Sequence, residues 1–190
     1  MVKKLLDLKH ISVTFKTRRG SFKAVDDLSL DLKEGEILGI VGESGAGKSI
    51  TGAAILGLIP SPGKLSSGTI SFRGQRIDLN PKIVRGSKIS MIFQDPLVSL
   101  NPLRRIGDQL VETIQAHSPC SRVEAIKRAR NSLEEVGIDP HRFDAYPHTF
   151  SGGMRQRVVI ALALAPGPAV IIADEPTTSL DVSNQDQVLK

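Results

Sequence analysis

One stretch of eight residues carries the clearest chemical signal in this sequence. From Gly42 to Ser49 it fits the pattern G-x-x-x-x-G-K-[S/T], and it follows the apolar run 37–41. In this pattern a buried strand leads into a glycine-rich turn whose backbone amides face an anion. The helix that follows adds its positive end to the same anion. The stretch therefore predicts a loop that binds phosphate groups.

Each part of this loop has an expected role. The glycines let the main chain approach the phosphates where a Cβ would collide. Lys48 is expected to reach the β- and γ-phosphates, and the Ser49 hydroxyl to bind Mg²⁺ in a site that keeps several waters. The residues expected to contact the nucleotide are Gly42, Glu43, Ser44, Gly45, Ala46, Gly47, Lys48, Ser49 and Ile50.

A second candidate lies where the apolar run 169–173 ends in Asp174 and Glu175. A buried strand that ends in carboxylates, beside a phosphate loop, is typical of a nucleotide site at the carboxyl edge of a parallel sheet. Asp174 is the candidate that orients Mg²⁺, usually through its waters, and Glu175 is the candidate that polarises the attacking water. An acidic turn that caps a following helix would also explain the pair, but not its occurrence together with the loop.

The third candidate is the start of a helix, Ser151-Gly152-Gly153, just upstream of the acidic strand. A serine N-cap with two glycines behind it is an anion-binding helix start. With the phosphate loop before it and the acidic strand after it, the stretch 150–157 resembles the signature of ATP-binding-cassette ATPases. The resemblance implies ATP and Mg²⁺ as cofactors. It also implies a head-to-tail dimer, in which the signature of one subunit closes on the γ-phosphate held by the other.

The resemblance assigns roles to further residues. Gln94 matches the glutamine that senses Mg²⁺ and water, and Asp181 matches a loop that crosses the dimer interface. Phe15 is the best match for the aromatic that stacks on adenine, with Phe22 as a competitor and a place in the core open for either. The implied catalytic residues are Glu175, Lys48 and Gln94; the implied metal ligands are Ser49, Gln94 and Asp174; the further implied nucleotide contacts are Phe15, Ser151, Gly152, Gly153, Gln156 and Asp181.

Within that family, the sequence over 42–45, 93–96, 99–102 and 146–157 resembles the ATPase subunits of bacterial dipeptide, oligopeptide and nickel importers. The implied function is ATP hydrolysis on the cytoplasmic side of the membrane, which drives uptake of peptides or a related small solute. The implied partners are a second ATPase subunit, identical or paralogous, and integral membrane permeases whose coupling helices would contact the helical insertion. The alternatives are a cassette that binds ATP without hydrolysing it and a soluble, non-transport ATPase of the same family.

The elements that must position these residues follow an α/β pattern. Two-residue alternation predicts antiparallel strands in the first third of the chain, with a shift near His10, followed by the core strand 37–41. A helix over 50–59, a break at 66–68 and strands over 69–72 and 89–93 come next. Helical periodicity and capping signals then predict three helices, which begin near Ile106, Ser121 and Ser151.

Together with the phosphate loop, this pattern predicts an α/β fold, and the family resemblance implies a P-loop NTPase (RecA-like) core. An N-terminal antiparallel β subdomain precedes that core, and an α-helical subdomain is inserted in it. We expect one cassette domain over 1–190, with 1–94 and 166–190 as the core with the β subdomain and 95–165 as the helical subdomain. The resemblance places a switch histidine beyond Asp181, whereas all four histidines lie upstream. The chain is therefore expected to be incomplete at its C-terminus and to hydrolyse ATP poorly, or not at all, unless extended.

Composition excludes other classes. No apolar run approaches the length of about 18 residues that a membrane span needs. The single cysteine, Cys120, cannot form an internal disulfide and predicts a reducing compartment. The net charge of +5 comes from cations spread along the chain, which favours a solvated surface over a nucleic-acid patch.

Overall fold

The computed structural model describes residues 4–18, 20–95 and 99–176. These residues form two compact units, one that ends at Arg85 and one that begins at Gly86. The phosphate loop belongs to the first unit, while the acidic strand and the Ser-Gly-Gly helix belong to the second. The candidate chemistry is therefore distributed over both units.

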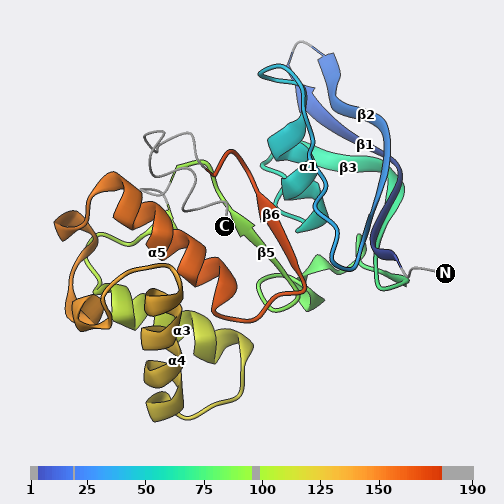
Figure 1. Ribbon diagram of the computed structural model, residues 1–190. Helices are drawn as coiled ribbons and strands as arrows, with labels where there is room; N and C mark the ends of the chain where they lie inside the picture. The colour runs from blue at the N-terminus through green and yellow to red at the C-terminus, as the bar shows by residue number, and fades with distance from the viewer. Residues whose placement is uncertain (1–3, 19, 96–98, 177–190) are drawn as a thin grey trace. The chain divides into compact units, whose positions relative to one another are not determined.

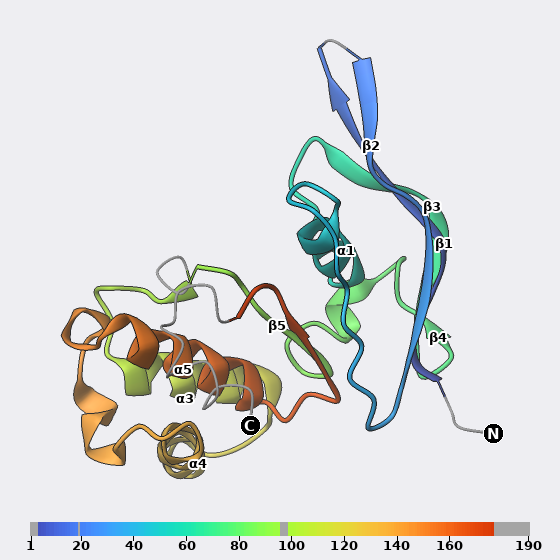
Figure 2. The same ribbon diagram turned by 45° about the horizontal axis from the view of Figure 1, so that its top comes forward.

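An antiparallel sheet builds the first unit, with the strand order β2-β1-β3-β4. β1 (Lys4–Thr17) and β2 (Gly20–Lys33) form a long hairpin, and β3 (Gly63–Phe72) pairs with the other edge of β1. The short β4 (Gln75–Arg76) pairs with the end of β3. α1 (Lys48–Ile55) lies against one face of this sheet (Figures 1 and 2). The predicted N-terminal antiparallel subdomain is thus confirmed, and the helix expected over 50–59 begins and ends earlier.

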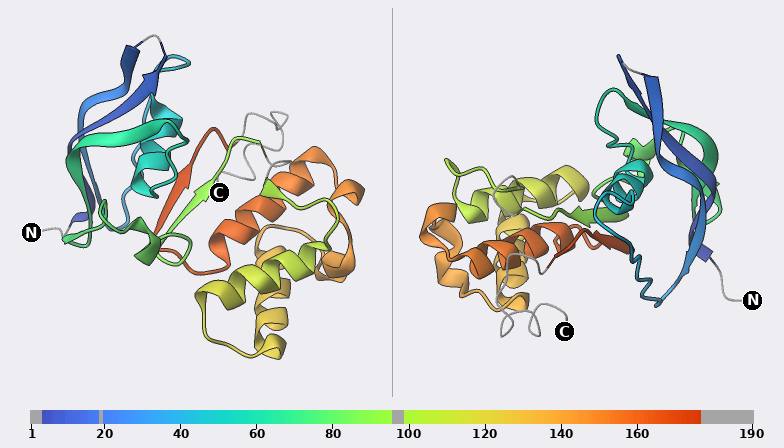
Figure 3. Two further views of the ribbon diagram at one scale, coloured as in Figure 1. Left: turned by 180° about the vertical axis from the view of Figure 1, so that it is seen from behind. Right: turned by 90° about the horizontal axis from the view of Figure 1, so that it is seen from above.

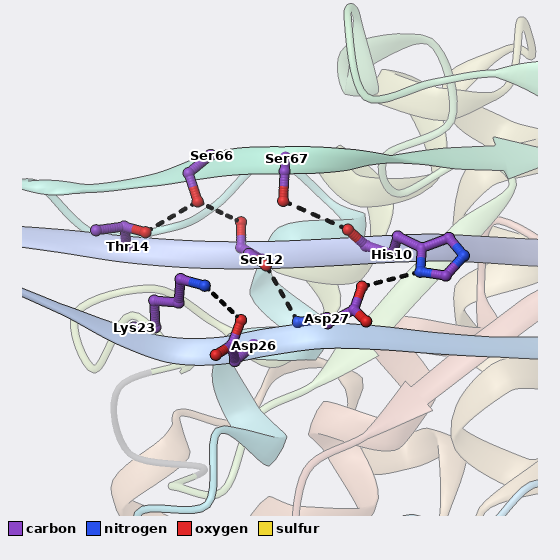
Figure 4. A network of polar contacts seen from close by, with 8 residues as sticks. All are labelled: His10, Ser12, Thr14, Lys23, Asp26, Asp27, Ser66 and Ser67. Atoms are coloured by element: carbon purple, nitrogen blue, oxygen red, sulfur yellow. Dashed lines mark hydrogen bonds and ion pairs between the residues drawn. The ribbon is translucent and has the colours of Figure 1, made fainter.

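The predicted shift near His10 is confirmed and has a local cause. His10 and Asp27 have φ values of 51° and 53°, and each lies at a register change. His10 is in the bulge of β1 between Leu8 and Ile11, and Asp27 is in the bulge of β2 opposite Ile11–Val13. His10 Nδ1 lies 2.9 Å from Asp27 Oδ1, and the Asp27 amide donates to Ser12 Oγ at 3.1 Å (Figure 4). The bond to Ser12 satisfies the Asp27 amide, which the bulge removes from the ladder.

The prediction that 66–68 interrupts the chain is wrong, because these residues lie inside β3. Gly68 has φ 86°, and a Cβ on it would collide with the carbonyl oxygen of His10. Ser66 Oγ donates to the Ser12 carbonyl at 3.0 Å, and Ser67 Oγ donates to the His10 carbonyl at 3.4 Å (Figure 4). The small polar residues hold β3 against the bulge in β1 rather than ending the strand.

The prediction of a buried core strand over 37–41 is also wrong for this structure. The turn at Lys33–Glu36 leads the chain out of the β2 ladder, and no strand in the described ranges pairs with the segment that follows. The side chains of Ile37 and Val41 are 99% and 97% exposed. A strand forms only where a neighbouring strand pairs with its amides and carbonyls, so an apolar pattern alone does not form one.

The second unit contains a parallel strand pair. β5 (Ile89–Ile92) and β6 (Val170–Ala173) pair with Ile89 opposite Val170 and Ile92 opposite Ala173. The Asp174 amide donates to the Ile92 carbonyl at 3.0 Å, which extends the pairing by one residue. The two apolar runs that were predicted to be buried strands thus pair, although a long helical segment separates them in the sequence. β5 is largely buried, whereas the prediction is wrong for most of β6, in which Ile171 and Ala173 are exposed.

Three helices make up most of the rest of this unit. They are α3 (Ile106–His117), α4 (Arg122–Glu135) and α5 (Gly152–Leu164), and short 3₁₀ turns connect the last two. α4 packs across α3, and α5 packs beside β5 (Figure 3). Their shared core contains Leu110, Ile114, Leu133, Phe150 and Val158. No helix in the described ranges is long and apolar enough to cross a membrane.

The predicted helix boundaries rest on caps that the structure contains. Ser121 Oγ accepts from the Glu124 amide at 3.2 Å at the start of α4. Gly137, with φ 71°, ends the turn after that helix. Ser151 Oγ accepts from the Met154 amide at 3.3 Å at the start of α5. Local capping chemistry therefore fixes where α4 and α5 begin, whereas α3 begins after Arg105 without a side-chain cap.

Candidate nucleotide site

The predicted phosphate loop is a tight connection into α1. Gly47 is the N-cap residue with φ 88°, and the helix begins at Lys48. The Ala46 amide donates to the Glu43 carbonyl at 3.2 Å, which closes a turn inside the loop. No acidic side chain lies in the first turn of α1, so no carboxylate there competes with an anion for the positive end of the helix. The loop offers backbone amides and a helix start to an anion.

Lys48 places its charge on this loop. Its Nζ donates to the Gly42 carbonyl at 2.8 Å and to the Glu43 carbonyl at 2.9 Å. Hydrogen bonds between ionised partners are about twice as strong as those between neutral partners. A phosphate oxygen is therefore a better acceptor for this ammonium than the two carbonyls, and Lys48 is available to an anion that enters the loop.

Substitution of Gly47 by alanine is expected to weaken nucleotide binding much more than substitution of Gly45. Both glycines have positive φ, 88° and 82°, so alanine is strained at either position. A Cβ on Gly47 would also collide with the carbonyl oxygen of Ala24, whereas a Cβ on Gly45 meets nothing within 4 Å. Backbone strain alone predicts that Gly45→Ala lowers the affinity for Mg-ATP about tenfold. The added collision predicts that Gly47→Ala lowers it about a hundredfold. Calorimetric titration with Mg-ATP measures both, and equal losses would contradict this reading of the loop.

The acidic strand end meets the predicted glutamine. Gln94 follows β5 and Glu175 follows β6, and Gln94 Nε2 donates to Glu175 Oε2 at 2.7 Å. Because the two strands are parallel, their carboxyl ends lie at the same edge, which brings the amide to the carboxylate. Two of the three predicted catalytic residues are thus in direct contact.

Glu175 has a backbone conformation that the sequence did not indicate. Its φ is 47°, in the left-handed region that residues with a Cβ seldom adopt. Such a conformation costs about 1–3 kcal/mol and persists only where the surroundings enforce it. No residue type or spacing near Asp174 signals this feature, so only the structure could find it.

The Ser-Gly-Gly start of α5 has the predicted form. Ser151 and Gly152 are exposed, and a Cβ on Gly152 would meet nothing within 4 Å. Just before them, the Phe150 side chain is buried and anchors the entry to the helix. The first turn of α5 therefore presents its amides at the surface of this unit.

Two arginines that sequence reasoning did not single out hold this entry in place. The Arg142 guanidinium lies over the Phe150 ring, 4.4 Å from its centre, and donates to the Thr149 carbonyl at 2.9 Å. Arg155 Nε donates to the Pro147 carbonyl at 2.8 Å. Planar guanidinium groups suit this combination of stacking and hydrogen bonding. An arginine close to a Ser-Gly-Gly start is the signal that could have suggested such a role.

Gln156 is a correction to the predicted site. It was expected to contact the nucleotide, but its side chain is fully buried and its Nε2 donates to the Pro176 carbonyl at 2.8 Å. A side chain without exposed surface cannot touch a ligand bound outside the unit. Asp181 and the rest of 179–181 lie outside the described residues, so the expected place of Asp181 at a dimer interface stays a prediction.

The predicted metal ligands fit Mg²⁺ by their chemistry. Ser49, Gln94 and Asp174 offer a hydroxyl, an amide and a carboxylate, all with oxygen donors. The described ranges contain no group of three His, Cys, Asp or Glu side chains that could hold a metal. Few protein ligands suit Mg²⁺, which usually retains waters and binds substrate phosphates.

The two candidate aromatics form a stacked pair. Phe15 and Phe22 face each other across the β1–β2 hairpin, with ring centres 5.4 Å apart and planes inclined by 12°. Phe22 is 55% exposed, while Phe15 is half-buried and packs against Gly63. The pair presents a flat apolar surface, which suits stacking by a base.

Removal of the base-stacking ring is expected to weaken ATP binding without weakening the binding of inorganic tripolyphosphate. Stacking is worth about 1–3 kcal/mol per base, so Phe15→Leu should raise the Kd for ATP about tenfold. Phe22→Leu is the matched variant and shows whether the partner ring carries the base instead. Titration of both ligands into each variant measures the effect. If neither variant weakens the binding of ATP more than the binding of tripolyphosphate, the hairpin does not bind the base.

Comparison with known proteins gives the class. The family described as "ABC transporter" matches residues 25–178. The match includes the phosphate loop, the start of α5 and the acidic strand end. The chain belongs to the ABC transporter family.

Within this family, the chain is similar to two curated ATP-binding proteins of peptide transport. The chain is 49% identical over 198 residues to the oligopeptide transport ATP-binding protein OppD of Bacillus subtilis (strain 168), covering 100% of this chain and 55% of that protein. It is 46% identical over 192 residues to the dipeptide transport ATP-binding protein DppD of Escherichia coli (strain K12), covering 98% of this chain and 59% of that protein. The chain thus spans a little over half the length of these relatives.

A solved structure supports the fold. The dimeric structure of the ATP-binding cassette MJ0796, in a post-hydrolysis state bound to ADP and Pi, matches with a TM-score of 0.83 and 29% sequence identity. The match covers 97% of this chain and 79% of that chain. The predicted α/β cassette fold with an antiparallel β subdomain is therefore confirmed.

Proposed function

We propose that this chain is the ATP-binding part of an importer for peptides or a related small solute. It would hydrolyse ATP on the cytoplasmic side of the membrane and drive uptake through separate permease subunits. The observation that carries the proposal is the 49% identity, over the whole chain, with an oligopeptide transport ATP-binding protein. The phosphate loop alone would support nucleotide binding without a transport role.

The described residues support separate roles in ATP hydrolysis. The amides of the loop and Lys48 would hold the phosphates, and Ser49, Gln94 and Asp174 would hold Mg²⁺. When bound, Mg²⁺ neutralises charge that develops on the phosphate oxygens. Glu175 would polarise the attacking water, and Gln94 orients its carboxylate through the 2.7 Å hydrogen bond.

The proposed complex contains a second cassette, either identical or paralogous. The exposed start of α5 supports this, because amides at a helix N-terminus suit the γ-phosphate of a nucleotide bound to a partner. We further propose one cassette domain, with 1–94 and 166–190 as the core with its β subdomain and 95–165 as the helical subdomain. Integral membrane permeases would contact the helical part, which places the protein at the membrane as a peripheral subunit.

Peptide uptake by cells tests this function. The chromosomal copy of the gene would carry the codon change Lys48→Ala, and uptake of a radiolabelled oligopeptide and of a free amino acid would be compared with the parent strain. We expect oligopeptide uptake to fall to background while amino-acid uptake is unchanged. Normal oligopeptide uptake, with nucleotide binding lost in the purified variant, would show that the protein serves another system.

A further inference from the structure

Gln156 is a buried polar residue that packing alone does not explain. It lies in the second turn of α5, and its side chain has no exposed surface. Its Nε2 donates to the Pro176 carbonyl, while its Oε1 has no hydrogen-bond partner in the part of the chain that the structure describes. A half-satisfied buried amide is less favourable than an apolar side chain of the same shape. Its presence therefore calls for a reason other than stability.

The acceptor of this bond is next to the acid. Pro176 directly follows Glu175, whose φ of 47° must be held by its surroundings. Gln94 bonds the Glu175 carboxylate at 2.7 Å, and Gln156 bonds the main chain one residue later at 2.8 Å. The side chain of the acid is thus tied to the end of β5, and its backbone is tied to α5, which packs beside that strand (Figure 3).

We infer that Gln156 is a positioning residue for Glu175. It joins the helix that begins at Ser151 to the backbone that carries the acid, so a displacement of α5 moves Glu175 with it. This inference rests on the proposed role of Glu175 in polarising water. Gln156 itself touches neither the nucleotide nor the water, since its side chain is enclosed within its unit.

The variant Gln156→Met tests this role, because methionine has a similar length and no polar group that could bond Pro176. Loss of one hydrogen bond is expected to speed hydrogen exchange of the Asp174 amide about tenfold. The melting temperature is expected to stay the same or rise, because the unpaired Oε1 is removed as well. Affinity for Mg-ATP should change by less than about twofold and kcat should fall about tenfold, since only the position of the acid is altered.

Gln109→Met is the matched comparison. Gln109 is the other buried glutamine of this unit among the described residues, and both ends of its amide are bonded. Its Oε1 accepts from the Asn101 amide at 2.9 Å, and its Nε2 donates to the carbonyls of Asn101 and Arg104 at 3.1 Å each. We expect Gln109→Met to lower the melting temperature, because it leaves these groups unpaired, and to leave exchange of the Asp174 amide unchanged.

The inference is supported if Gln156→Met speeds exchange at Asp174 without lowering the melting temperature. It is overturned if exchange at the Asp174 amide is unchanged. It is also overturned if the melting temperature drops as expected for Gln109→Met, because a residue with a merely structural role would have that effect. Absence of Mg-ATP binding by the unsubstituted protein would contradict the proposed function instead. In that case the exchange and melting measurements still decide the role of Gln156.

Discussion

The Lys48→Ala variant is expected to bind Mg-ATP at least about 100-fold more weakly than the unsubstituted protein. The Nζ of Lys48 lies within hydrogen-bond distance of two carbonyls of its own loop, so its charge is held where the phosphates are expected. A phosphate oxygen gains a charge-assisted bond from this ammonium that no neighbouring backbone amide can replace. The loss should appear in binding itself and not only in turnover.

Calorimetric titration of Mg-ATP measures this effect. Lys82→Ala is a suitable control, because it removes the same charge from an exposed position in the same unit. Its affinity should stay within about twofold of the unsubstituted protein, since exposed charges are screened at physiological salt. Unaltered affinity in Lys48→Ala, with its fold intact by circular dichroism, would show that the loop does not hold the nucleotide.

The Glu175→Gln variant is expected to bind ATP normally and to hydrolyse it about 10² to 10⁴ times more slowly. The substitution keeps the size of the side chain and an oxygen that can accept from Gln94. It removes the charge that polarises water. Steady-state release of phosphate measures the rate, and calorimetry measures the affinity.

Glu135→Gln is the control for this second variant, since Glu135 is an exposed acid at the end of α4. We expect its rate and affinity to match those of the unsubstituted protein. A rate for Glu175→Gln within about twofold of that value would remove Glu175 from the proposed mechanism.

The features that sequence predicted well are those set by nearby residues. The loop from Gly42 to Ser49, the serine caps of α4 and α5, and the hairpin strands on either side of the shift near His10 all follow from local backbone chemistry. Each of these predictions needed only local rules. The contact between Gln94 and Glu175 is a finding of the structure, since sequence reasoning placed the two residues after separate strands and did not pair them.

The features that sequence reasoning missed depend on distant contacts. The segment 37–41 has the composition of a core strand, but pairing requires neighbours that composition does not supply. Gly68 was read as a break because its close approach to the His10 carbonyl involves another strand. Gln156 was expected to contact the nucleotide because the family resemblance implied that role, whereas its side chain faces inward from α5 and is fully buried.

Oxidative cleavage by bound iron tests most directly whether the loop and the acidic strand end serve one metal–nucleotide complex. Fe²⁺ would replace Mg²⁺ in the presence of ATP, ascorbate and peroxide, and mass spectrometry would locate the cuts in the chain. We predict ATP-dependent cleavage both near Ser49 and near Asp174. Cleavage near Ser49 alone, with the stretch around Asp174 and Glu175 untouched, would contradict the shared site.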